Sequence, residues 1–134
     1  MAVFGMVKSG GGGVTETVLW SNNAPTTAVG QQTVTLSDAF TNYDEIRFYV
    51  RKSKTDDSYK DLYASCPTSF STSYSTLLFS SLGPIEADSN SYSRHLILDT
   101  SSPTSVTIST AYKMNASGSN NDYVIPLKIT GVKF

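Results

Sequence analysis

Short runs of alternating apolar and polar residues follow one another along the chain from residue 14 onward. The clearest run extends from Glu45 to Lys52, where Ile46, Phe48 and Val50 share one face. Alternation with a period of two is typical of strands whose side chains point in turn to the core and to solvent. Eight strands are predicted on this basis, at residues 14–20, 32–37, 45–52, 61–65, 75–80, 92–99, 105–114 and 123–134.

The segments between these runs are rich in Ser, Asn, Asp, Gly and Pro, which favour turns. No segment carries a helical period, although Ser37 to Thr41 can form one helical turn capped by Ser37 or Asp38. Each strand keeps one polar face, whereas the strands of parallel sheets are apolar on both faces. We therefore predict an all-β domain with the fold of a jelly-roll-like antiparallel β-sandwich.

The last predicted strand contains two residues that disturb a regular ladder. Pro126 has no N–H to donate, so this strand should lie at a sheet edge there or carry a bulge. Gly131 suggests a second irregularity. The alternation directs Ile125, Leu127 and Ile129 to the core and Lys128 and Thr130 to the outside.

A glycine-rich stretch, Ser9 to Gly13, divides the chain into two parts. Glycine loses the most conformational entropy on ordering, so this stretch is expected to be a linker. Residues 1–13 are then an N-terminal segment with its linker, and residues 14–134 form the sandwich. The apolar residues near the start are expected to pack on something that precedes or neighbours this domain.

Composition and charge narrow the classes of partner. A chain of 134 residues is long enough to bury a core. Charged residues make up 16% and the formal net charge is -1, so no bulk attraction to nucleic acid or anionic membranes is expected. Serine and threonine supply roughly a quarter of the residues, well above average usage. The apolar runs are too short to cross a bilayer and the start lacks the order of a signal peptide, so no membrane insertion is predicted.

The inventory of reactive residues does not favour catalysis. The chain holds one cysteine, Cys66, and one histidine, His95, which supply neither an intrachain disulfide nor a zinc ligand set. We expect Cys66 to fill the core and His95 to be a structural strand residue rather than the two halves of a Cys–His pair. Most acidic residues fall in turns, where Asp is expected to bond the backbone. The chain is therefore predicted to be non-enzymatic, without a cofactor or metal.

Basic and acidic residues interleave between residues 45 and 61, and their charges largely cancel. We interpret this segment as a solvated hairpin. A nucleic-acid surface would need uncompensated cations beside aromatic rings, and only Arg47, Tyr49 and Arg51 fit that description.

Eight tyrosines accompany this neutral polar surface. Four of them lie in or near predicted loops and are the candidate binding residues: Tyr59, Tyr63, Tyr74 and Tyr92. Tyrosine offers a large amphipathic contact at small entropic cost, and stacking on sugar rings is one use of it. In the alternative interpretation these rings cap the sandwich and keep their hydroxyls in water.

Several segments carry a resemblance to a known family. After the glycine-rich lead these are Val18 to Asn22 with Pro25 beyond it, Gln32 to Leu36, Tyr43 to Arg47, and the closing run Ile125 to Lys133. In this order they resemble the C-terminal domains of bacteriophage tail-fibre and related prophage proteins. They frame residues 10–134, whereas the middle, from about residue 53 to 114, carries no matching motif.

The resemblance implies a β-sandwich tip domain of a virion that attaches to a bacterial surface glycan or protein. It also implies a homotrimer with other virion proteins as partners, and it transfers no defined binding residues. Two other classes stay open. One is a structural virion protein for capsid decoration or tail assembly, and the other is a carbohydrate-binding or hydrolytic domain of cellular origin.

Overall fold

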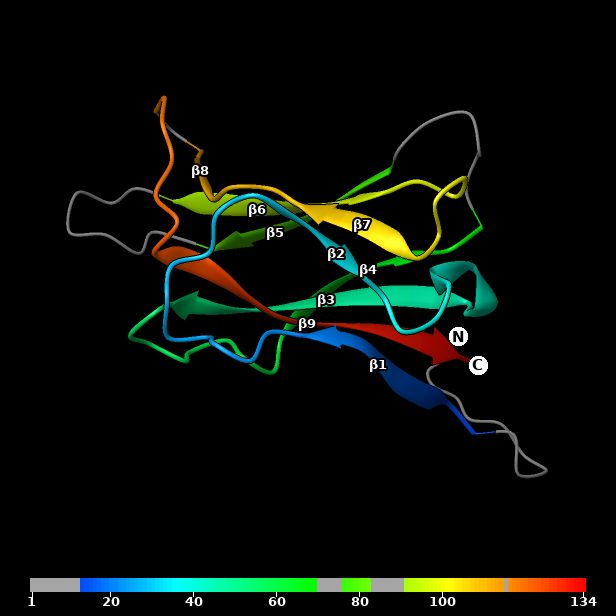
Figure 1. Cartoon of the computed structure of the whole chain (residues 1–134). Helices are drawn as coiled ribbons and strands as arrows, with labels where there is room; N and C mark the ends of the chain where they lie inside the picture. Colours follow the sequence, from blue (N-terminus) through cyan, green and yellow to red (C-terminus); the bar gives the residue numbers. More distant parts are fainter. Residues whose placement is uncertain (1–12, 70–75, 83–90, 115) are drawn as a thin grey trace.

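The alternating runs fold into two antiparallel sheets that face each other across an apolar core (Figure 1). In the computed structural model, the described residues are 13–69, 76–82, 91–114 and 116–134, with residues 76–82 described by their backbone alone. The predicted antiparallel β-sandwich is confirmed. Apart from Gly13, the predicted N-terminal segment lies outside the described residues. No helix in the described ranges has the length and apolar character needed to span a membrane.

The first sheet has the order β1-β9-β3-β4, with bounds β1 Thr15–Ser21, β9 Tyr123–Lys133, β3 Glu45–Ser53 and β4 Tyr63–Pro67. The second sheet has the order β2-β7-β6-β5, and β8 also pairs with β6. Its bounds are β2 Gln32–Thr35, β7 Ser105–Ile108, β6 Tyr92–Leu98, β5 Thr76–Leu82 and β8 Tyr112–Lys113.

Every predicted strand is present, but the run at 105–114 is divided into β7 and β8. The break begins at Ser109, directly after the end of β7, because its hydroxyl and its carbonyl bond to residues of β6. Its hydroxyl accepts the backbone N–H of His95 at 2.8 Å, and its carbonyl accepts the Arg94 side chain at 2.8 Å. The prediction of one continuous strand there was wrong because these contacts come from β6.

The predicted helical turn lies slightly later along the chain, as a 3-10 turn at Phe40–Asn42. The predicted cap was wrong, because the residue before the turn is Ala39 and makes no side-chain cap bond. The carboxylate of Asp38 instead accepts the backbone N–H of Ala39 at 2.8 Å and the side-chain amide of Asn42 at 2.9 Å.

The core lies between the sheets. The alternation of β3 is confirmed, since Ile46, Phe48 and Val50 are all buried in the main apolar cluster. Cys66 packs at the margin of this cluster as expected, and burial raises the pKa of its thiol.

Both options predicted for Pro126 are confirmed, because the pairing of β9 with β1 ends at Lys128 and leaves Pro126 paired with β3 alone, and because the strand carries a bulge there. The register opposite β3 shifts between Tyr49 and Val50 and leaves Leu127 as the extra residue. Asn22 occupies the carbonyls that the bulge releases. Its backbone N–H donates to Leu127 and its side-chain amide to Pro126, both at 2.8 Å.

The remaining expectations for β9 are mixed. Ile125 and Ile129 are buried as predicted, while Leu127 is only half-buried. No irregularity occurs at Gly131, which pairs regularly with both neighbouring strands. A β-carbon there would lie 2.5 Å from the ring of Tyr43, so glycine is required by close packing instead.

A fully buried arginine, Arg94 of β6, joins the two sheets. Its guanidinium donates to the carbonyls of Val29 at 2.7 Å, Ser109 at 2.8 Å, Val124 at 2.8 Å and Tyr123 at 3.0 Å. Burial lowers the pKa of Arg94 to about 10, so the group stays charged at neutral pH. Val124, whose carbonyl accepts one of these bonds, adopts a left-handed backbone conformation with φ 48°.

Candidate binding surface

The connection between β3 and β4 forms a hairpin at the same end of the sandwich as the β1–β2 connection (Figure 1). Its lysines each face a carboxylate: Lys52 to Asp56 at 3.5 Å, Lys54 to Asp122 at 3.3 Å and Lys60 to Asp57 at 3.4 Å. The cancelling charges predicted for this segment are thus arranged as ion pairs.

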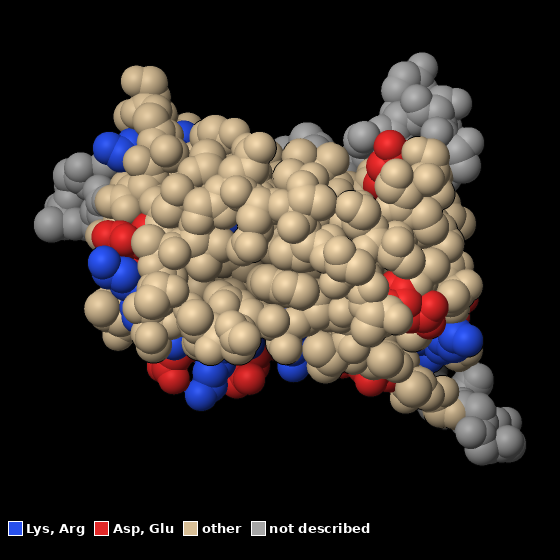
Figure 2. Space-filling model, in the orientation of Figure 1, with Lys and Arg blue, Asp and Glu red and all other residues tan. Residues whose placement is uncertain are grey.

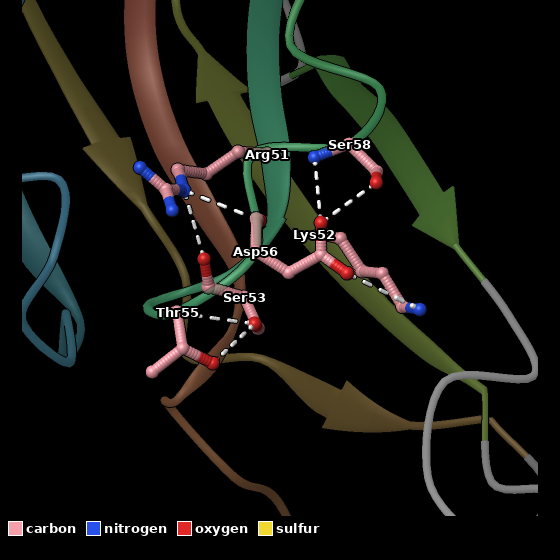
Figure 3. A network of polar contacts seen from close by, with 6 residues as sticks. All are labelled: Arg51, Lys52, Ser53, Thr55, Asp56 and Ser58. Atoms are coloured by element: carbon pink, nitrogen blue, oxygen red, sulfur yellow. Dashed lines mark hydrogen bonds and ion pairs between the residues drawn. The ribbon is translucent and has the colours of Figure 1, made fainter.

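Asp56 organises the root of the hairpin (Figure 3). One carboxylate oxygen accepts the backbone N–H of Ser58 at 2.9 Å and its hydroxyl at 2.6 Å. Arg51 donates to the carbonyl of Ser53 at 2.8 Å and to that of Asp56 at 3.3 Å. Asp and Ser commonly close turns in this way, so these bonds hold the root of the hairpin.

Three side chains project from the end of this hairpin and define what we call the hairpin surface: Tyr59, Leu62 and Tyr63. Their exposed fractions are 49%, 61% and 44%. The backbone N–H of Leu62 donates to the carbonyl of Tyr59 at 3.0 Å, which keeps them in one turn. Together these residues expose about 300 Å² of aromatic and aliphatic surface.

Tyr59 adopts an unusual backbone conformation, with φ 67°. A tyrosine in the left-handed region is uncommon and costs on the order of 1–3 kcal/mol. Such strain persists only where the surrounding structure determines it, and it concentrates at functional sites.

Tyr63 is supported from beneath by β3. The guanidinium of Arg47 lies 4.4 Å from its ring centroid, and the ring of Tyr49 lies at 5.1 Å. Arg47 is held in turn by Glu45 at 2.5 Å and Glu16 at 3.2 Å. Arg47 therefore covers one face of the Tyr63 ring, while much of the Tyr63 side chain remains exposed to solvent.

The outer face of the first sheet continues this polar cluster. Glu16 accepts hydrogen bonds from the hydroxyls of Tyr49 and Thr130, and the ammonium of Lys128 lies 4.5 Å from the Tyr49 ring centroid. Burial, with the Glu16 carboxylate as a further cause, raises the pKa of Tyr49 to about 12. Partial burial works against ionisation of Glu16, but the hydrogen bonds and Arg47 hold the pKa of Glu16 below its ordinary value. Thr130 faces outward as predicted, yet it is buried in this cluster.

The structure separates the four candidate tyrosines. Tyr59 and Tyr63 share the hairpin. Tyr92 was wrongly included, because the first residue of β6 faces the core, where its ring is fully buried and stacks on Tyr123 with centroids 4.8 Å apart. Tyr74 lies outside the described residues. Leu62 was missed, although an aliphatic residue in so polar a connection is a usable signal.

A pocket of about 380 Å³ lies in the β1–β2 connection and is lined by Asn22, Thr27, Ala28, Val29, Gly30, Gln31 and Gln32. Figure 2 shows that the centre of the viewed face is mostly uncharged, with charged residues around its rim, many of them along the lower side. The backbone of Asn121 bonds Val29 at 3.1 Å, and that of Asp122 bonds Lys54 at 2.9 Å. The pocket and the hairpin are therefore anchored to the same short segment.

The reactive residues are dispersed. The described part of the chain has no group of three or more His, Cys, Asp or Glu side chains that could hold a metal ion. Cys66 belongs to the first sheet and His95 to the second. The ring of His95 lies 5.4 Å from that of Tyr112, and burial lowers the pKa of the imidazole.

The fold and this surface define a two-sheet β-sandwich domain that presents exposed tyrosines on a pre-organised hairpin. Searches against protein-family models, curated proteins and solved structures found no match to the chain. The functional interpretation therefore rests on the residues themselves.

Proposed function

We propose that this chain is a non-enzymatic receptor-binding domain of the phage tail-fibre type, which attaches a virion to the bacterial surface through the hairpin surface. The observation that carries the proposal is Tyr59. Its strained backbone is fixed by the hairpin, yet half of its side chain lies in water and adds little to the core. A contact between Tyr59 and an external partner would explain why a strained and exposed tyrosine is kept at this position.

The scaffold supports the same proposal. Binding residues are often found on loops that a rigid framework positions, and sandwiches cluster their loops at two ends. The two-sheet fold also agrees with the fold that the resemblance to tail-fibre domains implies. In this proposal the domain acts as a homotrimer on the virion, because three linked copies strengthen individually weak contacts.

Whole-cell binding tests the proposal. The labelled full chain is incubated with a panel of bacterial strains, and Tyr59→Ala and Tyr63→Ala are compared with Tyr112→Ala. Tyr112 is a matched control, because it is 41% exposed but belongs to β8 in the second sheet. We expect binding to at least one strain and losses of about fivefold or more for the two hairpin variants alone.

The alternative classes give different results. A structural virion protein would bind virion components and no cells. A hydrolytic domain would release products from bound polysaccharide. Light scattering on the full chain tests the trimer separately, and a monomer would contradict that part of the proposal.

A further inference from the structure

The lysines and arginines of the hairpin and of the adjoining part of β3 each contact an acidic side chain or a backbone carbonyl. The three hairpin lysines pair with carboxylates, and Arg51 donates to two backbone carbonyls. Arg47, the cation nearest Tyr63, contacts both Glu16 and Glu45, and its side chain is only 16% exposed. For Arg47, recognition of an anionic ligand would require these contacts to be broken, at a cost in desolvation and lost hydrogen bonds. At the exposed lysines, an anionic ligand would compete with the paired carboxylates.

The exposed area also bears on the class of partner. A stable protein–protein interface buries about 800 Å² on each partner. The hairpin surface, at about 300 Å², is well below that value. A ligand that covers two tyrosines and one leucine is closer in size to a few sugar residues.

We propose that the ligand of the hairpin surface is a neutral glycan of the bacterial surface, an inference that rests on the proposed function. Sugar rings have apolar faces that stack on tyrosine and hydroxyl edges that exchange hydrogen bonds with the phenol groups. Tyr59 and Tyr63 supply such contacts at small entropic cost. Leu62, which lies between them in the sequence, adds an aliphatic contact with the ligand. None of these contacts needs a net charge on the ligand.

The experiment uses the full chain and a strain that it binds. Cells are treated with periodate, which cleaves vicinal diols in sugars, or with protease, which removes surface proteins. Binding should be lost after periodate and retained after protease. Neutral polysaccharide purified from the same strain should inhibit binding, and dextran sulfate, a polyanion, should not.

Salt and a charge variant test the neutrality of the ligand. Raising NaCl from 0.1 to 1 M shortens the screening length from about 10 to about 3 Å. The dissociation constant should change less than about twofold over this range. Lys60→Gln, which removes an exposed cation beside Tyr59, should likewise change it less than about twofold, whereas Tyr59→Ala should weaken binding about fivefold or more.

Each contrary result has a separate meaning. Binding that survives periodate but not protease would overturn the glycan and indicate a protein receptor. Binding that falls more than about fivefold with salt, or that dextran sulfate blocks, would overturn neutrality. Both results would leave the receptor-binding function standing, whereas binding to no strain would contradict that function itself.

Discussion

Replacing Arg94 by methionine tests what holds the two sheets together. Methionine keeps much of the side-chain volume but removes all four hydrogen bonds that the guanidinium donates to backbone carbonyls. A buried polar group left without a partner costs about 1–3 kcal/mol, so the four carbonyls together lose on the order of 6 kcal/mol.

The same substitution also removes a buried charge. The pKa of Arg94 falls from 12.5 to about 10 because of burial. At 1.36 kcal/mol for each pKa unit, relief of this desolvation returns on the order of 3 kcal/mol. The net destabilisation is then about 3 kcal/mol, a large part of the 5–15 kcal/mol that is typical of a domain. The melting temperature should fall by about 10 °C.

Urea and thermal unfolding of the full chain measure this effect. Arg51→Met is the matched control, because Arg51 also donates to two backbone carbonyls but lies near solvent, where water can replace it. The control should lose about 1 kcal/mol or less. If Arg94→Met unfolded within 0.5 kcal/mol of the wild type, on the order of the effect of a neutral surface substitution, the carbonyl bonds would not hold the sheets as we infer.

Three further predictions concern other parts of the chain. Gly131→Ala should lower the free energy of unfolding by about 1–3 kcal/mol in urea, because its β-carbon would lie 2.5 Å from the Tyr43 ring; an unchanged value would contradict that close contact. Tyr59→Gly should relieve the left-handed strain and raise the free energy of unfolding by about 0.5–1 kcal/mol, with cell binding lost. The folded state lowers the pKa of Glu16, so its stabilising effect is present above the unfolded pKa near 4.5 and is lost as pH falls through the folded value. The stability difference between wild type and Glu16→Gln should therefore shrink between pH 7 and pH 3, measured by urea unfolding, and a constant difference would contradict the pKa shift.

The strands were predictable because a period of two is a local signal, which Ile46, Phe48 and Val50 carry clearly. The break within residues 105–114 was not predictable, because nothing in its composition differs from that of a strand. It arises from contacts of Ser109 with Arg94 and His95 on another strand. Pro126 was predictable, because a missing N–H permits only an edge or a bulge, and the end of the β1 pairing at Lys128 and the register shift opposite β3 supply both.

The candidate site was predictable in part. Residue type and turn signals located Tyr59 and Tyr63 but wrongly added Tyr92, whose position at the start of a strand did not reveal that it faces the core. The alternation of β6 contained a signal for a buried arginine that the sequence prediction did not use. Arg94 has the same parity as Tyr92, Leu96 and Leu98, which places it on the inward face. Its carbonyl partners come from distant segments and cannot be inferred from local sequence.

Core and hairpin are connected through the segment before β9. Arg94 fixes the carbonyls of Tyr123 and Val124, and the neighbouring Asp122 bonds Lys54 at the root of the hairpin through both its backbone and its carboxylate. A variant that weakens Arg94 is therefore expected to weaken binding indirectly, and loss of binding alone does not identify a contact residue. Tyr59→Gly avoids this ambiguity, because stability should rise while binding falls, and an indirect structural effect would move both in the same direction.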